Sequence, residues 1–341
     1  MRISALALRI IQQFIQDKRS LALMFVAPIL ILSLLSLVFN SDPLKPNIGL
    51  VNMPTQLSQV LSHTADATTQ SFTNKADAQT ALKNRDLDAY IVIEKGQLSL
   101  HLEGSDPTVT QAVMQWLQKS LATLPEQQSN IVNHFLHGSP DMSTFDSFGP
   151  VLVGFFAFFF VFLLSGVSFL RERTGGTLER LVCSPMKLWE IIIGYVLGFG
   201  LFTLIQSLII SAYSIYILKL MMMGSFLLVL LITLLLSLTA LTLGILLSAF
   251  ANNELQMMQF IPIIIVPSVF FSGLFNLEAM SKWISWIGQL TPLYYAADAL
   301  RDIMIRGSGW HEILMPALVL IAFSLLFMLL NLLALRKLRK G

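Results

Sequence analysis

Six long apolar segments constrain this chain more than any other feature of its sequence. A helix needs ~20 mainly apolar residues to cross the ~30 Å hydrocarbon layer of a membrane, and each segment is of about that length. Only 12% of the 341 residues are charged, about half the share found in soluble domains, which excludes an ordinary soluble enzyme. We predict a polytopic α-helical membrane protein with spans at residues 20–39, 148–170, 191–217, 225–250, 257–276 and 313–335.

The charges and the cysteine exclude further classes of protein. No span carries an ionisable side chain near its centre, which argues against a proton-relay pump. The formal net charge of +2 is too small for a nucleic-acid-binding protein, and the single cysteine, Cys183, excludes a disulfide within the chain. The first apolar segment ends in Val38 and Phe39, a poor cleavage site for a signal peptide, so we interpret it as a retained anchor.

Lysine and arginine residues predict how the spans are oriented, because cytoplasmic loops carry an excess of both. Four such residues lie before the first span, four in the segment after the second span, and four in the basic tail 336–341. Six spans place all three groups on the same side. We therefore predict that this side is cytoplasmic and that both ends of the chain lie there.

Two regions outside the spans have recognisable patterns. In residues 1–19, Leu6, Ile10 and Phe14 recur at helical spacing, which predicts an amphipathic helix along the cytoplasmic face of the membrane. Residues 40–147 are polar and are predicted to form a small α+β domain outside the membrane. Its strands are predicted at 47–51, 89–93 and 98–102 and its helices at 54–62, 75–85 and 107–124, the last one capped by Ser105-Asp106-Pro107.

The cytoplasmic segment 171–190 is the most informative part of the chain. Gly175 and Gly176 allow a sharp reversal of the backbone after the second span. Thr177 is a suitable cap for a short helix over 178–182, and Ser184-Pro185 would end that helix. These residues fit an element that transmits force from a cytoplasmic partner, and they fit a solvated turn between two spans equally well.

A resemblance favours the first interpretation. The segment resembles the signature R-E-R-x-x-G-T-L-E-x-L-x-x-S-P-x-x-x-x-E of ABC-2 family permeases, the membrane subunits of a class of ABC transporters. In that family the segment is the coupling helix that docks into an ATP-binding subunit. The role carries over only to the matching positions of this chain, which are Glu172, Arg173, Gly176, Thr177, Leu178, Glu179, Leu181, Ser184, Pro185 and Glu190, together with Arg171.

The resemblance extends over nearly the whole chain. It implies a type V exporter fold, an outer domain between the first two spans, short outer-leaflet helices in the connector 277–312, and the plasma membrane of a bacterium as location. The phosphate-binding pattern G-x-x-x-x-G-K-[ST] is absent, so this chain binds no ATP itself. The resemblance implies that ATP and magnesium bind to a separate ABC ATP-binding subunit. Six spans are half of the family's usual twelve, which implies a second copy or a paralogous permease.

The same resemblance implies a transport path walled by the second and fifth spans. Both spans are rich in phenylalanine, and an aromatic slot suits hydrophobic or amphipathic cargo. The candidate residues are Phe155, Phe156, Phe159, Phe162, Phe270 and Phe271, although contact with lipid or a neighbouring helix explains any one of them as well. Pro262 and Pro267 predict a kink in the fifth span. Gln206 and Asn331 are expected to form hydrogen bonds between helices.

Two other functions compete with an exporter subunit. A membrane hydrolase is disfavoured because the chain lacks H-E-x-x-H and G-x-S-x-G patterns. A receptor or scaffold, whose outer domain binds a ligand or partner without transport, would not need the segment 171–190. In the short turn between the fourth and fifth spans, Asn252, Asn253 and Glu254 are expected to cap helix ends rather than to contact an ATPase.

Overall fold

The computed structural model of the chain divides into two compact units. One unit comprises residues 1–39 and 135–341, and the other comprises residues 40–134. The structure describes residues 2–39, 45–54, 57–58, 61, 67–84, 86–94, 97–102, 107–121, 144–274 and 287–340.

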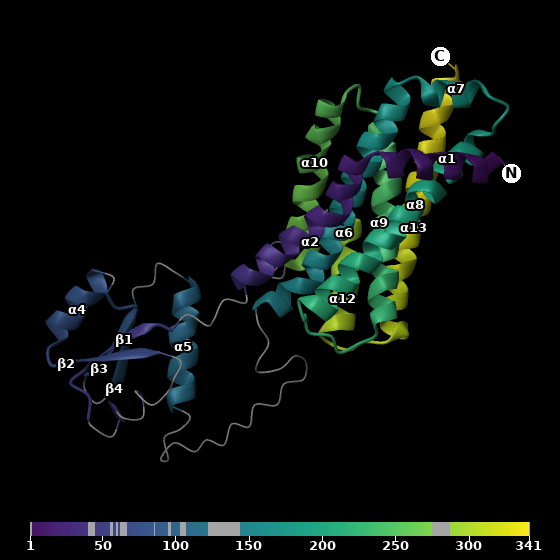
Figure 1. The fold of residues 1–341 in the computed structure, drawn as a ribbon. Helices are drawn as coiled ribbons and strands as arrows, with labels where there is room; N and C mark the ends of the chain where they lie inside the picture. Colours follow the sequence, from purple (N-terminus) through teal and green to yellow (C-terminus); the bar gives the residue numbers. More distant parts are fainter. Residues whose placement is uncertain are drawn as a thin grey trace. The chain divides into compact units, whose positions relative to one another are not determined.

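The first unit is helical (Figure 1). It contains, in chain order, α1 (Arg2–Gln16), α2 (Lys18–Phe39), α6 (Thr144–Thr174), α7 (Thr177–Cys183), α8 (Leu188–Ala212) with its π-helical end η1 (Tyr213–Ile217), α9 (Phe226–Ser248), α10 (Glu254–Val269) with its π-helical end η2 (Phe270–Leu274), α12 (Pro292–Met304) and α13 (Trp310–Lys340). Among the described residues, six helices are long and apolar enough to cross a membrane, which confirms the predicted number.

Several of these helices extend beyond the predicted spans. Helix α6 continues from residue 170 to Thr174, so Arg171, Glu172 and Arg173 belong to a helix and not to the predicted loop. Helix α13 runs through most of the predicted basic tail to Lys340. The hydropathy signal ends where the polar residues begin, whereas Arg, Lys and Glu are themselves good helix formers and the helix goes on.

Helices α6 and α9 form the centre of this unit. In the most apolar stretch of α6, 72% of the residues are buried, whereas the corresponding share is 17% for α13 and 22% for α2. The two central helices approach closely at Gly244 of α9, where an added Cβ would lie 2.6 Å from the Phe162 carbonyl oxygen of α6. Small residues allow such close backbone contacts between membrane helices. The peripheral helices α2 and α13 leave many of their apolar side chains exposed.

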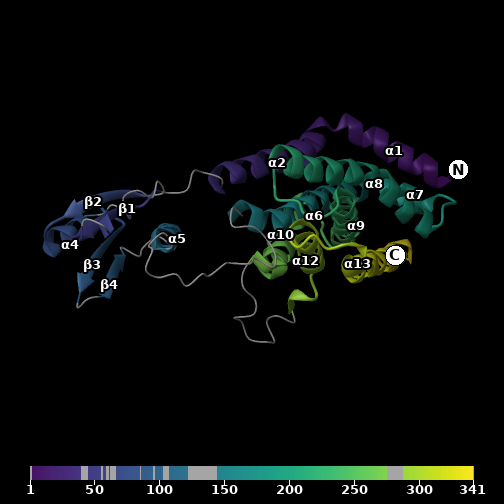
Figure 2. The ribbon, with the colours of Figure 1, turned by 90° about the horizontal axis from the view of Figure 1, so that it is seen from below.

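Helix α1 packs along α8, and α9 and α13 follow across the unit (Figure 2). The apolar side of α1 buries Leu6, Ile10 and Phe14. It contacts α8 where that helix has Gly194 and Gly198, and a Cβ at Gly198 would lie 2.8 Å from Ile10. The sequence predicts an amphipathic helix correctly, but its apolar side covers α8 rather than only the membrane surface.

The buried polar residues of the long helices behave differently from one another. Asn331 of α13 donates from Nδ2 to the Thr242 carbonyl of α9 at 2.8 Å, which confirms the expected bond between helices. Gln206 of α8 is 1% exposed, yet neither of its amide atoms has a hydrogen-bond partner among the described residues. The expected interhelical bond of Gln206 is therefore not formed in this structure.

The fifth span bends at a glycine beyond its two prolines. Pro262 and Pro267 lie inside α10, and the chain then passes into η2, where Gly273 has a φ of 84°. Glycine adopts this left-handed conformation without steric cost. The guanidinium of Arg301 on α12 donates to the Gly273 carbonyl. Residues 275–286, which include the first part of the predicted outer connector 277–312, lie outside the described part of the chain.

The second unit contains a four-stranded sheet in the order β2-β1-β3-β4. Strand β1 (Asn47–Val51) pairs in parallel with β2 (Thr68–Phe72) and with β3 (Ala89–Glu94), and β3 pairs antiparallel with β4 (Gln97–Leu102). Strands β1, β3 and β4 match the predicted ranges. The sequence does not predict strand β2, because its residues TTQSF lack an apolar run.

The sheet has a separate apolar cluster on each face. One contains Ile48, Ile91 and Trp116 of α5 (Pro107–Leu121). The other contains Val51, Tyr90 and Ala78 of α4 (Lys75–Lys83). The proposed Ser105-Asp106 cap and much of the predicted helix 54–62 lie outside the described residues. This α+β unit is held together without cysteine, as the sequence requires.

Candidate coupling site

Helix α7 lies between the two long helices α6 and α8 and is entered through a glycine pair. The amide of Gly175 donates to the Arg171 carbonyl at 2.9 Å and ends α6. Gly176, with a φ of 72°, is the N-cap residue of α7. The prediction that Thr177 caps this helix is wrong, because the left-handed conformation needed for the reversal falls on Gly176 and Thr177 is already helical.

Helix α7 has a buried side and an exposed side. Leu178 is 1% exposed, and Leu181 packs partly buried against the helical core. Glu179, Arg180 and Cys183 are exposed. The helix therefore rests on the unit through its leucines and presents a carboxylate, a guanidinium and a thiol to its surroundings.

Specific hydrogen bonds fix the return from α7 to α8. The Ser184 hydroxyl donates to the Leu181 carbonyl at 2.6 Å, and Arg2 of α1 donates from Nη1 to the Pro185 carbonyl at 2.7 Å. The Glu190 side chain accepts from the Lys187 amide at 2.7 Å and caps the start of α8. These contacts tie both ends of the α7 segment to longer helices.

The end of α6 forms what we call the charged junction: Arg171, Glu172 and Arg173 with their partners. Glu172 is 5% exposed. Its Oε2 accepts from Arg9 Nη2 of α1 at 2.7 Å and from the Tyr195 hydroxyl of α8 at 3.2 Å. A buried carboxylate needs such partners, because removal of water from an unpaired charge is costly.

The two arginines of the junction reach other neighbours. Arg171 donates from Nε to Glu254 of α10 at 2.7 Å and lies 3.4 Å from Asp17, the residue between α1 and α2. Arg173 donates to the carbonyls of Ala249 and Ala251 in the turn between α9 and α10. The three adjacent residues thus connect α6 with α1, α8 and the α9–α10 turn.

Asp17 also supports the start of α2. Its carboxylate accepts from the hydroxyl and the amide of Ser20. The hydroxyl bond is the main reason that the pKa of Asp17 lies below its ordinary value, and the charge of Arg171 lowers it further. Asp17 is therefore ionised at neutral pH and holds α2 and the charged junction together.

The structure divides the ten residues that the resemblance assigns to coupling. Glu172, Arg173, Leu178, Ser184 and Glu190 have internal partners or are buried, so they position α7. Glu179 and Pro185 are exposed, while Gly176, Thr177 and Leu181 are half-buried. The sequence did not reveal the partners Arg9, Tyr195 and Glu254, since no local pattern links residues so far apart. The predicted cap at Asn253 is confirmed, because its side chain accepts from the Gln256 amide.

The six candidate phenylalanines do not share one surface. Phe155 and Phe159 of α6 stack on each other with ring centroids 5.7 Å apart and are half-buried. Phe162 is 0% exposed and packs on Phe158, so in this structure it is a core residue. Phe156 is also buried, and Phe270 and Phe271 lie together in η2 with Phe271 buried.

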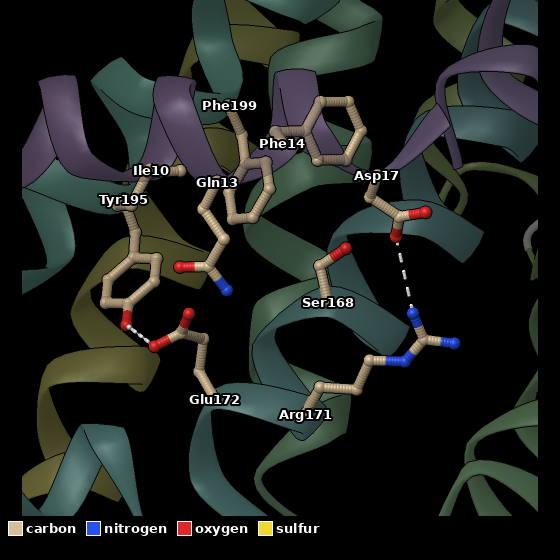
Figure 3. Close-up of a pocket in the computed structure, with 9 residues that line it drawn as sticks. All are labelled: Ile10, Gln13, Phe14, Asp17, Ser168, Arg171, Glu172, Tyr195 and Phe199. Atoms are coloured by element: carbon tan, nitrogen blue, oxygen red, sulfur yellow. Dashed lines mark hydrogen bonds and ion pairs between the residues drawn. The ribbon is translucent and has the colours of Figure 1, made fainter. Parts of the chain in front are cut away.

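A pocket of about 120 Å³ lies beside the charged junction (Figure 3). Its walls come from α1, α6 and α8 and from Asp17. The lining residues are Ile10, Gln13, Phe14, Asp17, Ser168, Arg171, Glu172, Tyr195 and Phe199.

Comparison with known proteins identifies the family. A model of the ABC-2 family transporter proteins matches residues 18–333. The chain belongs to the ABC-2 transporter family. It is therefore a multi-pass membrane protein and a permease component of an ABC transporter.

Individual relatives agree with this family. ABC transporter G family member 20 of Dictyostelium discoideum is 29% identical over 252 residues, which cover 71% of this ABC-2 permease and 34% of that protein, so the chain spans about a third of this relative. The probable multidrug ABC transporter permease YbhR of Escherichia coli is 23% identical, covering 70% of this chain and 67% of its own length. The probable multidrug permease YbhS of E. coli is 20% identical, and the match covers 96% of this chain and 94% of YbhS.

Proposed function

We propose that this ABC-2 permease works with a separate ABC ATP-binding subunit and exports a hydrophobic or amphipathic compound across the plasma membrane of a bacterium. ATP and magnesium bind to the partner subunit, and a second copy or a paralogous permease completes the complex. Both chain ends and α7 then face the cytoplasm. The names of the E. coli relatives, which describe probable multidrug permeases, support this class of cargo.

The exposed side of α7 is the observation that carries the proposal. Glu179 and Arg180 point away from the unit, while Leu178 anchors the helix below. In this mechanism the ATP-binding subunits close on ATP and displace α7. The charged junction passes that displacement to α1, α8 and α10, and hydrolysis resets the conformation. Coupling requires that nucleotide or cargo favours one conformation over the other.

The cargo path is proposed between two permease copies. Phe155 and Phe159 of α6 and Phe270 of η2 keep part of their surface exposed in one copy. Only 28% of the residues in the apolar stretch of α10 are buried, so most of this stretch is accessible to a partner or to cargo. Phe162 is excluded from this path, because it is fully buried in its own copy.

Two measurements test the proposal on the complex with its ATP-binding subunit. Native Cys183, exposed on α7 and the one cysteine of the chain, accepts a bifunctional crosslinker without any substitution. We expect crosslinks to the ATP-binding subunit whose yield changes with nucleotide. Glu179→Arg should reduce cargo-stimulated ATPase activity at least fivefold, whereas Glu312→Arg, an exposed control at the start of α13, should not.

Two different negative results would contradict two different parts of the proposal. If the purified permease never retains an ATP-binding subunit, the exporter proposal is wrong and a receptor or scaffold is favoured. If the subunit is retained but neither crosslinking nor ATPase activity responds to α7, the partner binds elsewhere and α7 is not the coupling element.

A further inference from the structure

Three aromatic side chains form one wall of the pocket beside the charged junction. Phe14 of α1 and Phe199 of α8 meet edge to face, with ring centroids 5.7 Å apart. Tyr195 stacks on Phe199 one helical turn away, at 6.2 Å. All three side chains line the pocket, together with Ile10. The rings of Phe14, Tyr195 and Phe199 are only 5%, 0% and 6% exposed, and aromatic rings next to a cavity favour cationic groups.

The opposite side of the pocket carries unpaired oxygen atoms. Both hydrogen bonds of the Glu172 carboxylate end on Oε2, and none among the described residues reaches Oε1. The Ser168 hydroxyl likewise has no partner in the described part of the chain. Figure 3 shows both side chains on the α6 side of the pocket, with Phe14 and Gln13 of α1 above them.

The balance of charge at the pocket is negative. The ionised groups that line it or bind to its lining are three carboxylates, of Asp17, Glu172 and Glu254, and two guanidinium groups, of Arg9 and Arg171. Arg171 is already shared between two carboxylates, so it offers little to an anion. A metal ion is also a poor fit, because a single free carboxylate oxygen among aromatic rings does not make a coordination shell.

The volume limits the size of the ligand. An apolar cavity of about 150 Å³ accommodates benzene. The pocket of about 120 Å³ therefore accommodates a group of about five non-hydrogen atoms, such as a quaternary ammonium with its four attached carbons.

We propose that this pocket binds a small organic ammonium group, with Glu172 as its counter-ion and Phe14, Tyr195 and Phe199 as its aromatic wall. Aromatic cages with a nearby carboxylate are a common solution for quaternary ammonium recognition. The ammonium belongs either to a free organic cation or to the headgroup of a choline or ethanolamine lipid. Because the pocket joins α1, α6 and α8, a bound ammonium stabilises the packing of α1 on the junction. This proposal is independent of the exporter proposal.

The first test uses the wild-type chain in a detergent without amines. Calorimetric titration with choline chloride is compared with titration with 3,3-dimethylbutan-1-ol, in which a neutral carbon replaces the nitrogen of choline. We expect choline to bind at least tenfold more tightly. The proposal is overturned if the two compounds bind equally tightly. It is also overturned if neither compound binds and no amine lipid is retained.

The second test uses variants. Glu172→Gln removes the counter-ion with little change in shape, and Ser168→Leu fills the pocket while Glu172 stays. Each should weaken choline binding at least tenfold, whereas Glu179→Gln, an exposed carboxylate outside the pocket, should not. Thermal unfolding verifies that each variant is folded, and if one variant fails, the other and the isostere comparison decide.

A third test distinguishes the two sources of the ammonium. Native mass spectrometry counts lipids retained from vesicles of phosphatidylglycerol alone or mixed with phosphatidylethanolamine or phosphatidylcholine. Preferential retention of an amine lipid that Ser168→Leu abolishes identifies a headgroup site. Choline binding without such retention identifies a site for free cations.

Discussion

The ion pair between Arg9 and Glu172 allows a quantitative test of the charged junction, because its two partners differ in exposure. The Arg9 side chain is 37% exposed and that of Glu172 is 5% exposed. Removal of Arg9 leaves a buried carboxylate with Tyr195 as its remaining donor among the described residues. Removal of the charge on Glu172 leaves a guanidinium that reaches water. We therefore expect unequal costs from the two substitutions.

The expected magnitudes follow from this asymmetry. Arg9→Ala should lower the free energy of unfolding by about 2–3 kcal/mol, below the range for a fully buried pair because water reaches Arg9. Glu172→Gln should cost about 1 kcal/mol, since the amide oxygen still accepts from Tyr195. In the double variant the buried charge is gone, so the loss of Arg9 adds little. The coupling energy of the pair should therefore be about 2–3 kcal/mol, close to the whole cost of Arg9→Ala.

The assay is unfolding of the purified permease in one detergent, followed by tryptophan fluorescence for all four members of the cycle. The pair between Asp302 near the end of α12 and Arg306 just after it, with side chains 19% and 49% exposed, supplies a control cycle, for which we expect a coupling of no more than about 0.5 kcal/mol. Additive effects of Arg9→Ala and Glu172→Gln, or a smaller cost for Arg9→Ala than for Glu172→Gln, would refute this account of the junction.

Three further predictions concern other contacts of the helical unit. Gly198→Leu should separate α1 from α8, because its Cβ would lie 2.8 Å from Ile10, and protease should then cleave α1 faster; Gly200→Leu, with no atom within 4 Å of its Cβ, is the control. Asp17→Asn should lower the melting temperature at pH 7, because a carboxyl with a lowered pKa stabilises the fold above its ordinary pKa of 3.8, and the difference from wild type should vanish as the pH falls through the lowered value. Arg301→Ala should loosen the bend at Gly273, seen as faster hydrogen exchange in η2, and Arg301→Lys should restore only part of the protection because a compact ammonium replaces the planar guanidinium that donates to the Gly273 carbonyl.

The sequence predicts the elements whose signal is local. The six spans follow from hydropathy, and the short helix after α6 follows from the glycine pair before it and Ser184-Pro185 behind it. Strands β1, β3 and β4 contain apolar stretches and are predicted, whereas β2 is a polar strand that the sequence does not predict. Its position depends on its neighbour β1 and not on its own residues.

The roles of individual side chains depend on contacts that the sequence does not reveal. The pattern R-E-R marks a special segment, but the neighbour that each charge reaches depends on how α6 is rotated in the fold. The same rotation separates Phe162, which faces the core, from Phe155 and Phe159. A run of phenylalanines on nearly every side of a helix carries no periodicity from which that rotation could be read.

The length of α6 gives it a mechanical property. From Val151 to Thr174 the helix contains no proline, and at 1.5 Å per residue this stretch is a rod of about 36 Å. At its other end the Asp146 carboxylate accepts from the Met221 amide in the connection to α9. In the proposed coupling mechanism, a push along this rod at α7 would reach Val151 with nearly its full stroke, because a continuous helix resists axial compression. Pro150 separates the rod from Asp146 and is the point in α6 where that motion could be taken up by a kink.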